Sequence, residues 1–218
     1  MDFLRPNSDP FVVAGLQRLS SEAFGPSGFA LEMDEVVHVL VHYGTHTFGY
    51  GHKVSGNQII YKGQSFEDDF SAQALDHWLD ECRDRSYTRG VGSWTTAEIH
   101  VFPNKSGRLD VFDEEHVERM SNGRWHPGGK PAGAQTWAQQ LLKYPRTVEN
   151  IPVWMWDVFR AEGVSPPIYN PEFDSVDWKN RRWPVTDRGT DSTVEPTVID
   201  PSLEPGVFAK ISKKLFGA

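Results

Sequence analysis

Residues 35–43, 46–54 and 58–63 alternate between hydrophobic and polar side chains, which is the pattern of β-strands. In the first of these segments, Val37 and every second residue after it share one face, and His38 begins the other face. Only two or three residues separate consecutive segments, and such short connections suit tight turns. The pattern therefore predicts a three-stranded antiparallel meander.

Two longer segments have the three- and four-residue spacing of amphipathic helices. The clearest is 65–85, SFEDDFSAQALDHWLDECRDR, whose aromatic and aliphatic residues fall on one stripe. Residues 10–24 form the second predicted helix, with Asp9 as its N-cap and Pro10 at its first helical position. Both helices have one apolar side to bury, so we expect them to pack on a sheet.

Two shorter helices are predicted further along the chain. Residues 136–144, TWAQQLLKY, form the first, which Pro145 ends. Residues 150–163 form the second, with Asn150 as its N-cap and Gly163 as its terminator.

Between the long and short helices, residues 94–113 have the pattern of a β-hairpin. Ala97, Ile99 and Val101 fall on one face of its first strand, and the turn PNKSG (103–107) is rich in turn-forming residues. With the meander, this hairpin predicts an α+β domain over residues 1–163, in which helices pack on one face of an antiparallel sheet.

The chain changes character after Val164. Seven of the fifteen prolines lie between residues 164 and 205, among Asp, Thr and Ser. Such a segment buries too little apolar surface to order itself, so we expect 164–218 to be a Pro-rich extension that drapes over the domain through Trp178 and Trp183. Its last residues, 208–218, have the pattern of a short basic amphipathic helix.

Charge and cysteine content narrow the range of functions. The formal net charge of −8 argues against nucleic-acid binding, which needs a basic surface. Cys82 is the single cysteine, so the chain can form no internal disulfide, as is usual in a reducing compartment. The start, MDFLRPNSDP, lacks a signal-peptide pattern, and no apolar run is long enough to span a membrane. We expect a cytoplasmic protein without a membrane partner.

Known catalytic and cofactor motifs are missing from the sequence. The chain has no HExxH, no paired cysteines and no GxSxG. The segment GRWHPGGKPAG (123–133) fails as a phosphate loop, because Arg124 replaces the first glycine and Pro131 replaces the Ser or Thr. His38 and His42 share a strand face but lie about 13 Å apart, too far to hold one zinc ion. We expect no cofactor and no metal.

The polar face of the hairpin carries the candidate functional residues. A histidine flanked by carboxylates can act as a general base, but opposite charges on paired strands are also ordinary sheet stabilisation. An acidic run follows the hairpin and suits either a solvated helix start or a docking patch for a basic protein. The candidate partner-binding residues are Glu98, His100, Arg108, Asp110, Asp113, Glu114, Glu115 and Glu118.

The stretch from Trp94, WTTAEIHVFPNKSGRLDVFDEEH, followed later by YPRTVENIPVWMWDVF, resembles the YezG-like immunity proteins of bacterial polymorphic toxin systems. The resemblance covers residues 10–160 and rests on element order with a few aromatic and glycine positions. It implies a protein without catalytic activity that binds and neutralises a toxin, often a nuclease. The GGKPAG loop and the segment after Val164 depart from that family's pattern.

These observations favour a non-enzymatic binding protein that neutralises a cognate, basic toxin by occlusion. An acidic surface would attract such a partner and speed its association. Two other functions remain open. One is a small hydrolase that uses His42, His52, His100 and Glu98, and the other is a secretion chaperone that holds an extended client segment.

Overall fold

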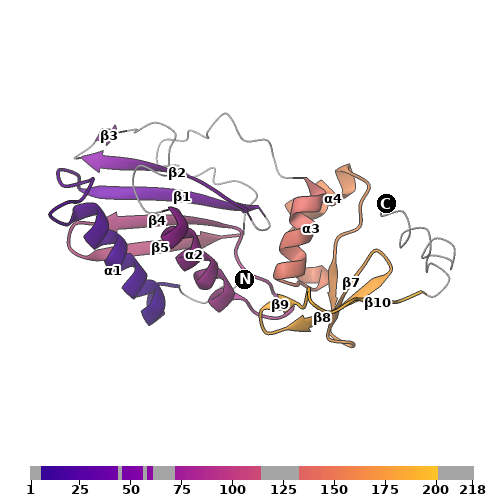
Figure 1. Ribbon diagram of the computed structural model, residues 1–218. Coiled ribbons are helices and arrows are strands. Elements are labelled where there is room, and N and C mark those ends of the chain that lie inside the picture. The colour runs from indigo at the N-terminus through magenta and orange to yellow at the C-terminus, as the bar shows by residue number, and fades with distance from the viewer. Residues whose placement is uncertain (1–5, 44–45, 56–57, 61–71, 114–132, 201–218) are drawn as a thin grey trace, which may run out of the picture.

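The computed structural model describes residues 6–43, 46–55, 58–60, 72–113 and 133–200. These residues form two lobes that lie side by side (Figure 1). The first lobe is a sheet covered by two helices, and the second combines two short helices with a smaller sheet. The predicted α+β class with antiparallel sheets is confirmed.

The sheet of the first lobe joins the meander to the hairpin. Its strands are β1 (Glu35–Tyr43), β2 (His46–Ser55), β3 (Gln58–Ile60), β4 (Thr96–Phe102) and β5 (Ser106–Phe112). They lie in the order β3-β2-β1-β4-β5, and every neighbouring pair is antiparallel. The pairing of β1 with β4 therefore brings the hairpin against the first strand of the meander.

Helices α1 (Pro10–Phe24) and α2 (Ala72–Ser86) both pack on one face of this sheet (Figure 1). The predicted cap of α1 is present, because the Asp9 carboxylate accepts a hydrogen bond from the Phe11 backbone N–H at 2.8 Å. The first turns predicted for the second helix, residues 65–71, lie outside the described residues. The apolar stripes of both helices meet the sheet in a core that includes Leu16, Leu19, Leu75, Leu79, Trp94, Ile99, Val101 and Leu109.

The second lobe begins with helices α3 (Ala134–Lys143) and α4 (Val153–Ala161). A short 3₁₀ helix, η3 (Val148–Asn150), lies between them. The N-cap of α4 is Pro152 rather than the predicted Asn150, whose amide instead donates to the Gly90 carbonyl of the first lobe at 3.0 Å. Because a proline disfavours the helical conformation in the residue before it, Ile151 is extended (φ −77°, ψ 121°), and the helix begins only after Pro152.

The segment expected to be a Pro-rich extension contains five short strands. They are β6 (Ile168–Asn170), β7 (Ser175–Trp178), β8 (Arg181–Thr186), β9 (Gly189–Thr190) and β10 (Thr197–Val198). Their sheet has the order β10-β8-β7-β6, and β9 also pairs with β8. Ile168 and Trp178 pack against the core of α3 and α4, so this sheet is held by the helices before it. The predicted basic helix at 208–218 lies outside the described residues.

Two fully buried arginines connect the lobes. The Arg146 guanidinium donates to both carboxylate oxygens of Asp113, at 2.7 and 2.9 Å, and to the Ser93 carbonyl at 2.6 Å. Arg83 on α2 donates to the Gln140 side chain on α3 at 2.5 Å and lies over the Tyr144 ring. We call this region the arginine junction.

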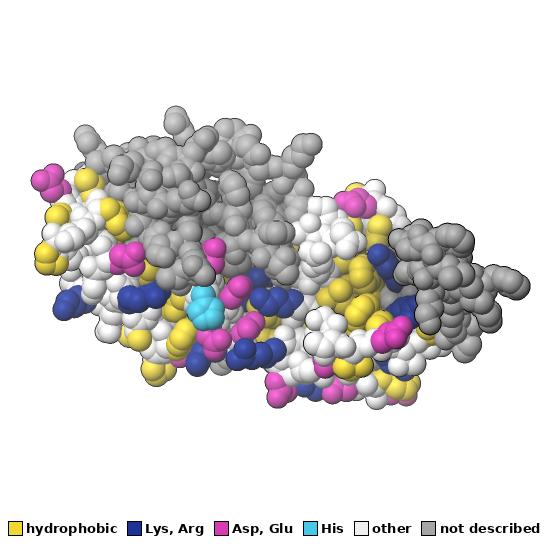
Figure 2. Space-filling view, viewed as in Figure 1, with side chains coloured by type: hydrophobic (Ala, Val, Ile, Leu, Met, Phe, Trp, Pro, Cys, Tyr) yellow, Lys and Arg dark blue, Asp and Glu magenta, His cyan; other side chains and the backbone are white. Residues whose placement is uncertain are grey.

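Among the described residues, none of the helices has both the length and the apolar character needed to cross a membrane. On the face shown in Figure 2, acidic and basic side chains are interspersed over the first lobe, whereas hydrophobic side chains gather on the second lobe.

Candidate functional site

The faces of the hairpin follow from its register. Ala97, Ile99 and Val101 of β4 are fully buried in the core that α1 and α2 cover. Because side chains alternate along a strand, Glu98 and His100 project from the opposite face of the sheet. This arrangement matches the alternation predicted from the sequence.

Four of the predicted residues come together on that face. In the register, Glu98 stands opposite Asp110 and His100 stands opposite Arg108. The His100 Nε2 atom lies 3.4 Å from Glu98 Oε2 and 3.8 Å from Asp110 Oδ2. Arg108 Nε donates to the same Asp110 oxygen at 2.5 Å.

Glu35 completes the group, although sequence reasoning did not select it. It is the first residue of β1, and its Oε1 atom lies 2.6 Å from His100 Nδ1. The next residue, Val36, is buried in the core and pairs with Val101 of β4, so Glu35 projects from the same face as His100. That relation depends on the pairing of β1 with β4, which sequence spacing cannot predict. We call Glu35, Glu98, His100, Arg108 and Asp110 the open-face cluster.

The open-face cluster is partly shielded from water. The side chains of Glu98 and His100 are only 12% and 13% exposed, whereas that of Arg108 is 50% exposed. The Glu98 Oε1 atom is buried, and among the described residues it has no hydrogen-bond partner. A buried carboxylate oxygen without a donor costs free energy, so the cluster is incomplete as it stands.

The local charges also act on His100. Partial burial lowers the pKa of His100, but its hydrogen bonds with Glu98 and Glu35 raise that pKa more, and the net shift is upward. Three carboxylates thus surround one imidazole, and Arg108 is the permanently charged cation of the cluster. The cluster therefore carries an excess of negative charge.

The donor set could also hold a metal ion. One ligand atom from each of Glu98, His100 and Asp110 lies within 4.8 Å of the other two. Imidazole nitrogen and carboxylate oxygen are both ligands of zinc and related divalent ions.

The other histidines proposed for a hydrolase are placed only by strand pairing. His52 stands opposite Val37, which is also the β1 partner of His100. His42 stands opposite Thr47, near the far end of the same strand. The side chains of His42 and His52 lie outside the described residues, so the predicted four-residue set stays a prediction.

Asp113 belongs to a different arrangement from the rest of the predicted set. Its carboxylate is held by both terminal nitrogens of Arg146, and its side chain is 14% exposed. The structure therefore gives Asp113 a partner inside the molecule. The remaining acidic residues of the predicted run, Glu114, Glu115 and Glu118, lie outside the described residues.

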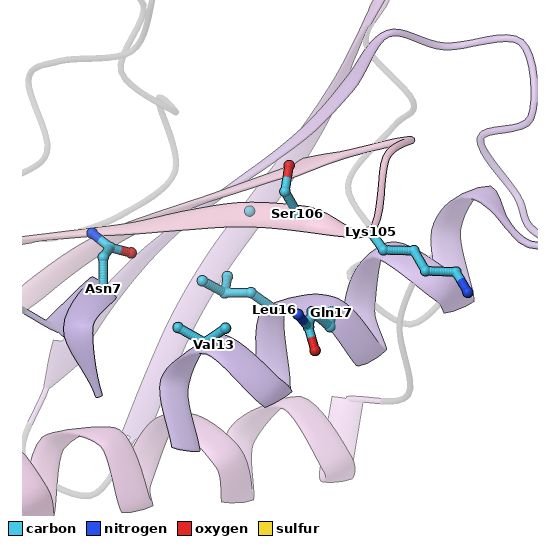
Figure 3. Close-up of a pocket in the computed structure, with 7 residues that line it drawn as sticks. Asn7, Val13, Leu16, Gln17, Lys105 and Ser106 are labelled. Carbon is cyan, nitrogen blue, oxygen red and sulfur yellow. The ribbon is translucent and has the colours of Figure 1, made fainter. Parts of the chain in front are cut away.

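A small pocket of about 100 Å³ lies elsewhere, between α1 and the turn of the hairpin (Figure 3). Leu16 and Val13 of α1 face the hairpin there, and the Lys105 side chain extends away from it. The Asn7 amide at its edge is already bonded to the Leu109 backbone in both directions. This pocket is on the helix-covered side and does not include the open-face cluster.

No protein-family model matches the chain, and no curated protein matches it significantly.

Proposed function

We propose that this chain is a non-enzymatic binding protein that neutralises a cognate bacterial toxin by occlusion. The observation that carries the proposal is the convergence of Glu35, Glu98 and Asp110 on the sheet face opposite α1 and α2. Among the described residues, α1 and α2 pack on the other face of the sheet, so this face is the candidate platform for a second molecule. The resemblance to YezG-like immunity proteins points to the same class.

A basic partner suits this face best. The chain carries a formal charge of −8, which would steer a cationic protein toward it over distances of about 10 Å or less at physiological salt. At contact, an arginine or lysine of the partner would pair with the Glu35 and Asp110 carboxylates, whose side chains are 23% and 32% exposed. Such charge-assisted hydrogen bonds fix the orientation of the partner as well as its affinity.

One experiment tests both the rescue of bacterial growth from the toxin and the binding of this chain to that toxin. The toxin candidate is the polypeptide encoded by the neighbouring reading frame, expressed in bacteria with and without this chain. We expect growth to be arrested by the toxin alone and restored by co-expression. Growth that stays arrested, together with no complex between the two purified proteins, would reject the proposal.

A matched pair of variants locates the contact surface. The double variant Glu35→Gln/Asp110→Asn removes two negative charges from the open-face cluster, and Asp76→Asn/Asp80→Asn removes two from exposed positions of α2. Both change the net charge equally, so a general loss of steering would affect them alike. We expect the first variant to slow association at low salt by about tenfold or more, and the second to slow it much less. Equal effects would place the contact elsewhere.

A small hydrolase is the second candidate, favoured by the 2.6 Å contact between Glu35 and His100 Nδ1. A carboxylate in that position orients an imidazole so that Nε2 can accept a proton. His100→Gln distinguishes the two functions. If His100 were the base, the variant would lose hydrolytic activity while still binding the toxin; if the protein acts by occlusion, rescue of growth would follow toxin binding and the unmodified chain would show no hydrolysis.

A further inference from the structure

The hydrogen bonds of His100 determine which of its ring nitrogens can bind a cation. Glu35 Oε1 lies 2.6 Å from Nδ1, so Nδ1 carries the proton and donates it to that carboxylate. Whenever the ring is neutral, the Nε2 lone pair points toward Glu98 and Asp110, which are also electron-rich. Three groups with lone pairs facing one another are unfavourable unless a proton on Nε2 or a metal cation lies between them.

The distances in the cluster fit a metal ion better than a proton. A proton shared by an imidazolium and a carboxylate holds the two atoms about 2.7–2.9 Å apart. The His100 Nε2 atom lies further away, at 3.4 Å from Glu98 Oε2 and 3.8 Å from Asp110 Oδ2. With bonds of about 2.0–2.2 Å, two ligands of a tetrahedral zinc ion are about 3.4 Å apart.

The surrounding groups have the roles that metal sites require. Metal-binding histidines almost always donate their second ring N–H to a carboxylate or carbonyl, as His100 does to Glu35. Metal-binding carboxylates are themselves hydrogen-bonded, as Asp110 is by Arg108. The buried Glu98 Oε1, without a hydrogen-bond partner among the described residues, is a free oxygen on the same carboxyl group as the candidate ligand atom.

We propose that Glu98, His100 and Asp110 bind a divalent transition-metal ion of the zinc type, with Glu35 as a positioning residue for the imidazole. The site would use three protein ligands and leave one coordination position for water. This inference does not depend on toxin binding, because it concerns the isolated chain.

The first test measures metal binding by the full-length chain after treatment with a chelator. Zinc is titrated calorimetrically, and Co²⁺ is added as a probe whose visible absorption reports tetrahedral coordination. We expect one zinc ion per chain at this site and at least a tenfold weaker affinity in each of His100→Gln, Glu98→Gln and Asp110→Asn. Glu35→Gln should weaken binding by about 10- to 100-fold without changing the stoichiometry.

His77→Gln is the matched control, because His77 is an exposed histidine of α2 outside the cluster. Its affinity and Co²⁺ spectrum should equal those of the unmodified chain. Affinity that is unchanged in His100→Gln, or no zinc binding at millimolar concentration, would overturn the proposal.

A measurement without substitutions guards against variants that fail to fold. Nitrogen-15 NMR of the unmodified chain reports each ring nitrogen separately. On addition of zinc, the Nε2 resonance of His100 should move while Nδ1 stays protonated. If zinc moves the resonances of other histidines and leaves His100 unchanged, the ion binds elsewhere and the proposal is wrong.

Discussion

The arginine junction and the open-face cluster each contain several charged side chains. They differ in how far these charges are paired with opposite charges inside the molecule. At the junction, Arg146 is fully buried and reaches a carboxylate and a backbone carbonyl at 2.6–2.9 Å. In the cluster, carboxylates outnumber the permanent cations, and Glu98 Oε1 is buried with no donor among the described residues. Arg146 Nε is also buried without a partner among the described residues, but the charge of Arg146 is matched by that of Asp113, whereas the cluster has three carboxylates around one permanent cation.

This difference in pairing distinguishes charges that stabilise the fold from charges that can bind another molecule. A buried ion pair whose two charges match holds two lobes in one arrangement but leaves no net charge for a ligand. Charges that a protein leaves partly unpaired lower its own stability and are available to bind something else. Asp113 and Asp110, which are three residues apart in the sequence, therefore have different roles despite the same chemistry.

The largest effect is expected from removing the junction cation. Arg146→Ala leaves Asp113 and the Ser93 carbonyl without their donor in a protected site. We expect the free energy of unfolding to fall by about 3–5 kcal/mol, measured by urea denaturation. Arg160→Ala is the control, since the side chains of Arg160 and Asp157 are both mostly exposed, at 66% and 64%. A loss no greater than in that control would show that the junction does not hold the lobes together.

The second arginine of the junction should matter less. Burial lowers the pKa of Arg83 to about 10, and its donors reach neutral acceptors, the Gln140 side chain and the Trp94 carbonyl. In Arg83→Met the apolar part of the side chain is retained while two acceptors lose their donors. We expect a loss of about 1–3 kcal/mol in the same denaturation experiment. A loss equal to that of Arg146→Ala would mean that the charge itself, and not its carboxylate partner, stabilises the junction.

The sequence predicts one of these two regions far better than the other. The two faces of the hairpin follow from local alternation, so Glu98, His100, Arg108 and Asp110 could be selected before the structure was known. Glu35 could not, because its approach to His100 depends on how two distant strands pair.

The local sequence predicts neither the arginine junction nor the second sheet. Arginines are normally exposed, and nothing near Arg146 in the sequence indicates that it is buried. Strands as short as Gly189–Thr190 and Thr197–Val198 in a Pro-rich segment have too few residues to show an alternation. They are held by pairing with β8, and that sheet packs on helices, so tertiary contacts override the local composition.

A change in the open-face cluster should have a smaller effect than either junction variant, and the opposite sign. Glu98→Gln removes one of three negative charges and introduces an amide that can donate to a neighbouring carboxylate. In chelator-treated protein we expect the free energy of unfolding to rise by about 0.5–1 kcal/mol. A fall of more than about 2 kcal/mol would show that Glu98 stabilises the fold as Asp113 does, and the contrast between the two regions would be lost.

The smallest effect is expected from Asp177 and Arg182, a partly exposed ion pair of the second sheet, which shows what an ordinary ion pair contributes. Partial burial raises the pKa of Asp177, but hydrogen bonds from Arg182 and Asn170 lower it more, and the net shift is downward. The pair therefore stabilises the fold above the unfolded pKa of about 3.9, and this contribution is lost as the pH falls through the lower folded value. Asp177→Asn should be slightly less stable than the unmodified protein at about pH 7, with the difference vanishing once the pH has fallen below the lowered folded pKa of Asp177. Urea denaturation across this range measures it, and a difference that persisted in acid would come from packing rather than from charge.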